Sequence, residues 1–415
     1  MLPGRLVVLR PAAALVLALV VTVALSATSA SRERAEPSLT PGAQRYPDVA
    51  TNGRDYLVVW QDERYPNETH VFGTRVTAGG RVLDPGGIPI GASPSVQYAP
   101  SVAWDGRNYV VAWIDGTGSP EGDDLKAARV SPSGIVVDRT PIAVATAPHG
   151  QGPPELAWTG TSTLVVWQDA RAGNTVGIWG TQIDRRGRVL RPNGFQLVPG
   201  DQGGNPRVGC SRRRCLAAWG YDRMDGARVA ASGTVLDRKG FPIIRWSPAG
   251  APFDPVIASA GRDWLVVWRQ EWNDRERAAD ISAIRITRSG KLRTRAPIRL
   301  VTGGGYQMDP DVAWTGANYL VVFSDDRTAS WDIAAVRLSA EGRRLDRKQI
   351  RIHPGYSRQE YPAVASNGRN SLVVWQGSGQ SPSDIFGARL TRSGRVIERR
   401  DPVWGDRFLI SVGRN

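Results

Sequence analysis

The sequence is poor in the residue types on which most catalytic and metal-binding motifs depend. Histidine occurs only at positions 70, 149 and 353, and no two of these are spaced as a metal-binding pair. No Gly-x-Ser-x-Gly motif, phosphate-binding loop or dinucleotide-binding glycine motif occurs. These absences exclude the enzyme classes that short motifs define. They leave open a site built from carboxylates, which no short motif marks.

Long hydrophobic runs are also scarce. One apolar stretch, residues 11–25, follows Arg5 and Arg10 and precedes small residues that end at Ala30. This layout is typical of a signal peptide, and the run is short for a membrane span. We therefore expect residues 1–30 to be a signal peptide and the mature chain to be secreted, extracellular or periplasmic, without a transmembrane segment. An uncleaved membrane anchor is the alternative.

The sequence is rich in one repeat of about fifty residues. A proline recurs seven times, an aromatic residue follows each proline by thirteen positions, and an Arg or Gln further on precedes a glycine by five. The prolines stand at 47, 100, 154, 206, 255, 310 and 362, and the aromatic residues are Trp60, Trp113, Trp167, Trp219, Trp268, Phe323 and Trp375. Two spacings kept through seven copies establish the repeat.

Each copy is predicted to form four short strands, a to d. Turn dipeptides such as Asn52-Gly53 separate strands a and b, and the apolar run of strand b, such as residues 56–60, needs cover on both faces. Neighbouring blades of a propeller supply that cover, whereas an open β-solenoid would need capping units that neither end shows. The pattern predicts an all-β fold, a seven-bladed β-propeller of four-stranded antiparallel blades.

The predicted propeller spans residues 46–415. Its blades cover about 46–97, 98–151, 152–203, 204–252, 253–307, 308–359 and 360–415. Residues 408–412 are expected to supply the outer strand of blade seven. Residues 38–42 also resemble the end of a strand d, so docking of the N-terminal segment 31–45 on the last blade is a second way to close the ring.

The block Val-Val-Trp-x-Asp-x-Arg recurs at residues 58–64 and 165–171, and at 321–327 with Phe for Trp. It resembles the repeat of exported bacterial seven-bladed β-propeller proteins, mostly of unassigned function. The resemblance covers essentially the whole mature chain and implies fold and location. It carries no catalytic residues to transfer. The fourth copy departs most, with Gly220-Tyr221-Asp222-Arg223 in a shortened loop.

The chain has two cysteines, Cys210 and Cys215, at the positions that flank the turn between strands a and b of blade four. Opposed residues on antiparallel strands have Cα atoms within disulfide range, and an exported compartment permits oxidation. We expect a structural disulfide. A redox or metal role is the alternative, although the sequence places no further cysteine or histidine beside the pair.

Charge is also unevenly distributed. The formal net charge is +14. The a–b and c–d turns, which leave a propeller on one face, are rich in arginine, whereas the b–c loops on the opposite face are rich in acids. The basic face predicts contact with an anionic polymer or cell-surface glycan, with no specific nucleic acid, and we expect a monomer. The alternative is that these are ordinary solvated turns.

An aspartate follows the repeat aromatic by two at Asp62, Asp115, Asp169 and Asp325. We interpret it as structural, holding the b–c loop with Arg64, Arg171 or Arg327 as ion partner. A carboxylate ring for Ca²⁺ or a cationic ligand is the alternative, but the spacing of dedicated calcium loops is absent. No other cofactor is predicted.

The residues that directly follow the repeat prolines vary between blades and are expected at the mouth of the central channel. The candidate ligand-binding residues are Asp48, Glu155, Asp311 and Arg207. Our first functional hypothesis is a secreted or cell-surface binding scaffold without enzymatic activity. The second is a carbohydrate-active enzyme or lectin that uses these carboxylates, and a rigid structural spacer is a third.

Overall fold

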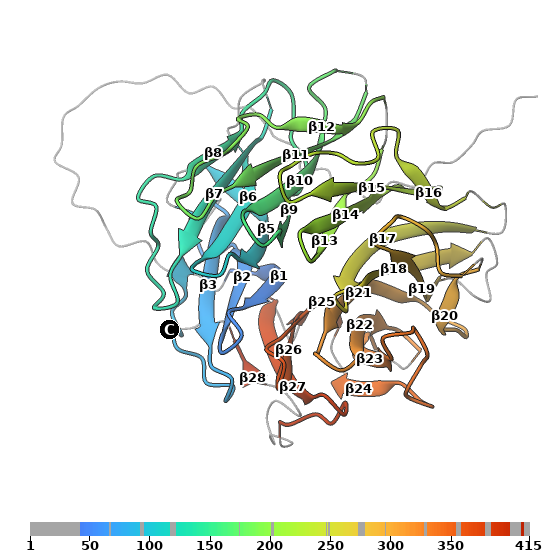
Figure 1. The fold of residues 1–415 in the computed structure, drawn as a ribbon. Coiled ribbons are helices and arrows are strands. Elements are labelled where there is room, and N and C mark those ends of the chain that lie inside the picture. Colours follow the sequence, from blue (N-terminus) through green and yellow to red (C-terminus); the bar gives the residue numbers. More distant parts are fainter. Residues whose placement is uncertain are drawn as a thin grey trace, which may run out of the picture. The chain divides into compact units, whose positions relative to one another are not determined.

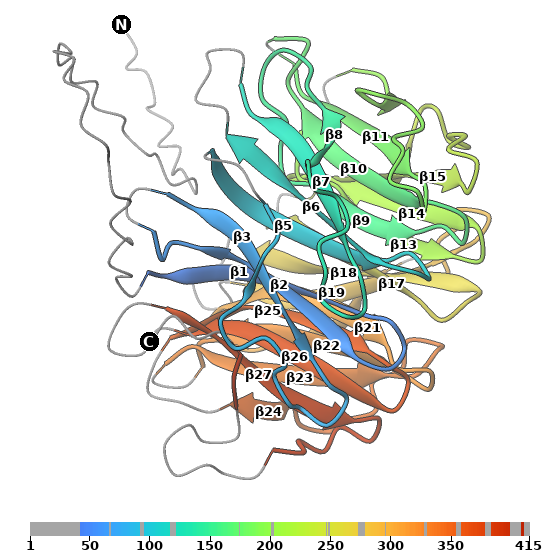
Figure 2. The same cartoon turned by 90° about the vertical axis from the view of Figure 1, so that its left-hand side faces the viewer.

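The computed structural model describes residues 42–65, 68–91, 95–116, 122–173, 175–200, 203–245, 247, 250–272, 279–294, 296–327, 330–353, 358–377, 383–398 and 408–410. These residues form seven separate sheets, each of four antiparallel strands paired in chain order. Figure 1 shows the sheets arranged as blades of a ring, and Figure 2 shows them from the side. The predicted fold class is confirmed. Within this described part no helix is present that could span a membrane.

Every blade has the same order of strands from the centre of the ring outward. The inner strands are β1 (Gln44–Thr51), β5 (Val96–Trp104), β9 (Glu155–Trp158), β13 (Arg207–Ser211), β17 (Gly250–Ser259), β21 (Gln307–Trp314) and β25 (Gln359–Ser366). The second strands are β2 (Tyr56–Asp62), β6 (Tyr109–Gly116), β10 (Thr163–Asp169), β14 (Arg214–Trp219), β18 (Asp263–Trp272), β22 (Tyr319–Asp325) and β26 (Asn370–Gly377).

The two outer positions complete the blades. The third strands are β3 (His70–Val76), β7 (Asp124–Val130), β11 (Gly177–Ile183), β15 (Met224–Ala230), β19 (Ala279–Thr287), β23 (Asp332–Leu338) and β27 (Asp384–Thr391). The outermost strands are β4 (Ile88–Pro89), β8 (Ile142–Ala145), β12 (Phe195–Val198), β16 (Phe241–Ile244), β20 (Ile298–Val301), β24 (Ile350–His353) and β28 (Phe408–Leu409).

The second strands form the core, as their uninterrupted apolar sequence predicts. The seven repeat aromatic residues are all at most 1% exposed. They lie in hydrophobic clusters that join adjacent blades, such as the cluster that holds Trp60 of blade one with Leu372 and Val374 of blade seven. Burial of apolar side chains between blades therefore stabilises the ring.

The repeat Arg or Gln on the third strand joins each blade to the next. Arg75, for example, binds Asp84 of its own blade through Nη2 at 2.8 Å and donates from Nη1 to the Pro132 carbonyl of blade two. The same donation to the following blade recurs at every boundary: Arg129 to Arg185, Gln182 to Ala231, Arg228 to Arg288, Arg285 to Glu341, Arg337 to Arg392 and Arg389 to Ala78. We call this series of contacts the interblade clamp.

The clamp explains the glycine that follows each Arg or Gln by five. Gly80 has φ of +84°, and a Cβ there would lie 2.8 Å from Nε of Arg389, which reaches in from blade seven. The turn glycine therefore leaves room for the guanidinium of the preceding blade as well as supplying the left-handed backbone. The glycine is therefore required by the turn of its own blade and by the arginine or glutamine of the preceding blade.

The ring closes between blades seven and one. β28 pairs with β27, so the C-terminal strand completes blade seven as expected. At the same boundary Gln44 donates its backbone N–H to the Ser383 carbonyl at 2.7 Å. The predicted signal peptide, and residues 31–41 of the segment expected to dock on blade seven, lie outside the described residues.

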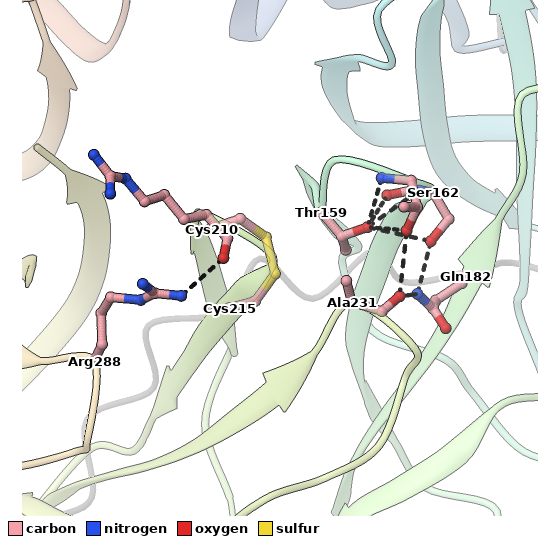
Figure 3. The surroundings of a disulfide bond; sticks show 9 residues. Thr159, Ser162, Gln182, Cys210, Cys215, Ala231 and Arg288 are labelled. Carbon is pink, nitrogen blue, oxygen red and sulfur yellow. Dashed lines mark hydrogen bonds between the residues drawn. A yellow bond between two sulfur atoms is a disulfide. The ribbon is translucent and has the colours of Figure 1, made fainter. Parts of the chain in front are cut away.

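The predicted disulfide is present. Cys210 and Cys215 face each other in the register of β13 and β14, with Cα atoms 4.0 Å apart and the two sulfurs bonded (Figure 3). Ser211 and Arg214 also pair, so the turn between them consists of Arg212 and Arg213 alone, with φ of +43° and +68°. Two non-glycine residues therefore occupy left-handed backbone in a hairpin that the disulfide cross-links.

The structural interpretation of the aspartate that follows the repeat aromatic is also confirmed. Asp62 accepts hydrogen bonds from the Trp60 indole at 2.7 Å and from the Arg64 backbone and guanidinium. Asp169 and Asp325 pair in the same way with Arg171 and Arg327, and Asp115 pairs with Lys126 instead. All four carboxylates are buried. They hold loops in place and do not supply open negative charge to the face on which they lie.

Candidate functional site

The four residues predicted at the channel mouth occupy equivalent positions on four inner strands. Asp48 lies on β1, Glu155 on β9, Arg207 on β13 and Asp311 on β21, the strands nearest the centre of the ring in Figure 1. All four are half-buried. Electrostatic interactions connect each of them to the other three. We call these four residues the inner cluster.

Glu155 and Arg207 form the one ion pair within the inner cluster, with Arg207 Nη1 2.8 Å from Glu155 Oε2. Burial raises the pKa of Glu155 to about 7, although Arg207 opposes the shift. Burial alone would lower the pKa of Arg207, but nearby carboxylates, Glu155 first, raise it. The cation therefore stays charged, while Glu155 titrates near neutrality.

Asp48 and Asp311 make the same contacts in blades one and six. Each accepts the backbone N–H of the next residue and, through its second oxygen, a backbone N–H of the next inner strand at 2.7 Å, from Val102 and Val364 respectively. Burial raises the pKa of Asp48 despite these bonds. It also raises the pKa of Asp311, to about 7, with a further contribution from the neighbouring carboxylates. Glu155 and Asp311 therefore share protons around neutral pH.

A strained backbone position lies next to the inner cluster. In five blades the residue before the repeat proline has φ between +50° and +52°, and the strand pairing is interrupted there by a bulge. These residues are Tyr46, Ala99, Asp254, Asp309 and Tyr361. A residue before proline ordinarily favours extended backbone. Such strained backbone is common at functional sites.

Exposed aromatic residues collect at the same end of the ring. Within the described part of the chain the large aromatic residues classed as exposed are Tyr46, Tyr221, Tyr306 and Tyr361. Tyr46, Tyr306 and Tyr361 lie at or just before the starts of inner strands, and Tyr221 lies in the loop between β14 and β15. The rings of Tyr46 and Tyr361 meet edge to face with centroids 4.9 Å apart. We call these four residues the tyrosine rim.

Further charged residues connect the rim to the inner cluster. Burial raises the pKa of Asp309 to about 6, and Asp254 contributes to the shift. Arg269 lies 3.3 Å from Asp254 and stacks over the Phe253 ring. No group of three or more His, Cys, Asp or Glu side chains arranged as metal ligands occurs among the residues that the structure describes.

Sequence reasoning identified the inner cluster and missed the rim. The inner cluster stood out because its residues vary at a fixed position of the repeat. Two members of the rim, Tyr46 and Tyr361, could have been found from the same alignment of copies, since they precede repeat prolines directly, as Asp254 and Asp309 do. Their left-handed backbone could not, because proline at the next position predicts the opposite.

No family model matches the chain, and no curated protein matches it. Among solved structures, the chain is similar to an acylaminoacyl peptidase from Pyrococcus horikoshii, at 10% identity and a TM-score of 0.50, covering 87% of this chain and 53% of that one. A puromycin-hydrolysing peptidase from Mycobacterium tuberculosis matches at 14% identity and 0.51, covering 86% and 52%. An α-L-arabinanase from Penicillium chrysogenum matches at 12% and 0.48, covering 84% and 93%.

The two peptidases, whose propellers resemble this chain, are enzymes, and this contradicts the first functional hypothesis, the non-enzymatic binding scaffold. The chain spans about half the length of the two peptidases, and identities of this size show a shared propeller fold and no more. The chemistry assigned to this chain must therefore come from its own residues. Of the hypotheses above, the carboxylate-based one is the better supported.

Proposed function

We propose that the protein is a carbohydrate-active enzyme, a glycoside hydrolase, whose reacting groups are the carboxyls of the inner cluster. The observation that carries the proposal is one cluster of half-buried carboxyls around Arg207, which lies 2.8 Å from Glu155; burial raises the pKa of both Glu155 and Asp311 to about 7. Glycoside hydrolysis needs one carboxyl that donates a proton and a second that acts as a carboxylate. Burial and neighbouring charges commonly supply this pairing.

The contacts of the two carboxyls favour a division of roles. Glu155 has a cation at 2.8 Å, which favours its ionised form. Among the described residues Asp311 has no ion-pair partner, and the nearby carboxylates favour its protonated form. Asp311 is therefore the proton donor, and Glu155 is the carboxylate that faces the positive charge developing on the sugar. Arg207 positions Glu155, and Asp48 maintains the negative field of the cluster.

The tyrosine rim supplies a binding surface of the kind that a sugar requires. Tyrosine offers a flat apolar face together with a hydroxyl that can form hydrogen bonds. Tyr46 lies two residues before Asp48 on the same strand. A sugar ring stacked at the rim would therefore have its neighbouring linkage within reach of the inner cluster.

The test is a panel of polysaccharides and oligosaccharides assayed for both binding and product release. Glu155→Gln and Asp311→Asn should each lower release by at least about 100-fold, the scale of a lost general acid or base. Asp48→Asn disturbs the equivalent pair of backbone hydrogen bonds in blade one, so its smaller effect on release measures what the loss of such bonds contributes. Binding without release would show a lectin and refute hydrolysis. If the protein neither binds nor cleaves any carbohydrate of the panel, the carbohydrate proposal as a whole is refuted.

We further infer that the mature protein is exported and that its basic face meets an anionic polymer or cell-surface glycan. The disulfide supports an oxidising compartment, and the Val-Val-Trp-x-Asp-x-Arg repeat supports the resemblance to exported bacterial propeller proteins. Arg186, Arg212, Arg213 and Arg343 are exposed in the a–b and c–d turns. Their attraction to a polyanion would be screened by salt over about 8 Å.

A further inference from the structure

The interblade clamp lacks its arginine at one boundary, between blades three and four. In blades one, two, four, six and seven the clamp arginine is followed nine residues later by an acid that holds it. Blade three has Gln182 in place of the arginine and, nine residues on, Arg191 in place of the acid. Gln182 keeps the contact with the Ala231 carbonyl at 2.8 Å (Figure 3). The positive charge has thus moved from the clamp to a new position.

A cavity of about 420 Å³ lies at this boundary. Arg191 and Arg238 line it, together with the apolar side chains of Phe195, Leu197 and Val235. The volume falls within the range of small-molecule sites. Cavity, altered clamp and displaced charge therefore coincide in one place.

Among the described residues no carboxylate lies within ion-pair distance of Arg191 or Arg238. Asp237, the residue before Arg238, is already bound through both oxygens by Arg228. Arg191 donates to the Gly233 carbonyl at 3.5 Å, and its Cζ lies 4.7 Å above the Phe195 ring. Stacking on an aromatic ring orients a guanidinium while leaving its N–H edge free to bind an oxyanion.

From these observations we propose that this cavity, the blade 3–4 cavity, binds a small organic anion whose carboxylate or phosphate lies between Arg191 and Arg238. The apolar body of the ligand would rest on Phe195, Leu197 and Val235. The site is separate from the inner cluster and does not depend on the proposed hydrolase activity. Its chemistry excludes cationic ligands, in contrast to the acidic inner cluster.

Isothermal titration of the purified protein with phenyl phosphate tests the proposal, with benzoate and inorganic phosphate as comparison ligands. Phenyl phosphate should bind at one site, and at least about fivefold more tightly than inorganic phosphate, because the ring buries apolar surface. If benzoate binds as tightly as phenyl phosphate, the natural ligand is expected to be a carboxylate. If phenyl phosphate binds and benzoate does not, a phosphate ester is expected.

Adjacent residues provide a matched pair of variants. Arg238 lines the blade 3–4 cavity, whereas Lys239 lines a different cavity. Arg191→Gln and Arg238→Gln should each raise the Kd for phenyl phosphate at least about tenfold, since each removes a charge-assisted hydrogen bond. Lys239→Gln removes the same charge and should leave Kd within about twofold.

A rebuilding variant guards against a loss of binding that reflects unfolding. The double change Gln182→Arg with Arg191→Asp restores the pair found in five other blades, so the protein should keep or gain thermal stability while losing phenyl phosphate binding. Absence of binding by the unaltered protein would overturn the proposal. So would an equal effect of Lys239→Gln and Arg191→Gln, which would show only diffuse attraction to a basic surface.

Discussion

The contact between Arg389 and Glu398 should be a main determinant of stability at the ring closure. Arg389 Nε lies 2.7 Å from Glu398 Oε1, and its Nη1 donates to the Ala78 carbonyl of blade one at 2.9 Å, across 311 positions of sequence. The two side chains are 16% and 10% exposed. Arg389→Gln removes the cation and leaves the Glu398 carboxylate largely buried without an ion partner.

The magnitude follows from which bonds are lost. Gln182 shows that a glutamine at this position can still reach the next blade, so the contact with Ala78 should survive in part. The lost contact is the charge-assisted pair with Glu398, worth about 2–3 kcal/mol at this burial. For a domain of this size the unfolding entropy is roughly 0.8 kcal/mol/K, which converts the loss to a fall in Tm of about 2.5–4 °C.

The assay is thermal and urea unfolding of three variants: Arg389→Gln, Glu398→Gln and the double change. The double variant should recover more than half of the loss, because replacing both partners leaves no buried charge unpaired. Arg129→Gln is the control at an interior boundary, where Arg129 makes the same bonds to Asp138 and Arg185.

Two results would refute this reasoning. A loss below about 0.5 kcal/mol in both Arg389→Gln and Arg129→Gln would show that the clamp contributes no more than an exposed ion pair. A double variant less stable than either single variant would show that Glu398 is not left unpaired, contrary to the geometry.

Three further predictions follow from the site, the disulfide and the charge distribution. Because the fold raises the pKa of Glu155 to about 7, above its ordinary value, its stabilising effect is present at acid pH and is lost as the pH rises through 7; Tm should fall between pH 5 and pH 8, and Glu155→Gln should reduce that fall. Reduction of the disulfide should lower the free energy of unfolding by about 2 kcal/mol, measured in urea with and without dithiothreitol. Changing Arg212, Arg213 and Arg214 to Ser should weaken retention on immobilised heparin and lower the salt needed for elution, while Asp222→Ser, an exposed acid of the opposite face, should not; equal retention of all variants would contradict the basic-face assignment.

The blades, their number and the disulfide could be predicted because the repeat shows each structural requirement seven times. A single apolar run such as residues 56–60 is ambiguous, but its fixed distance from a proline in every copy identifies strand b. Cys210 and Cys215 occupy the same positions of their repeat as Thr51 and Tyr56 in blade one. The pairing of Thr51 with Tyr56 across the first hairpin therefore also places the two cysteines opposite each other. Repetition therefore supplied the long-range information that one copy lacks.

The interblade clamp could not be predicted from the sequence. Arg75 and Asp84 are nine residues apart in the sequence, but the carbonyl that completes the contact belongs to another blade, so the spacing alone does not show what it serves. The four aspartates that follow the repeat aromatic contribute to the acidic composition of the b–c loops, although burial and the partners Arg64, Lys126, Arg171 and Arg327 neutralise them. Sequence shows where charges lie along the chain and not which of them are already paired.

The clamp also gives the ring a direction. Every blade donates from its third strand and accepts at its own c–d turn, and all seven contacts run the same way around. Such head-to-tail recognition is the rule by which identical subunits form closed cycles or open filaments, depending on whether the rotation closes. In this protein the blades take the place of subunits and are joined in one chain. The contact between Arg389 of blade seven and Ala78 of blade one closes the series of blades into a cycle.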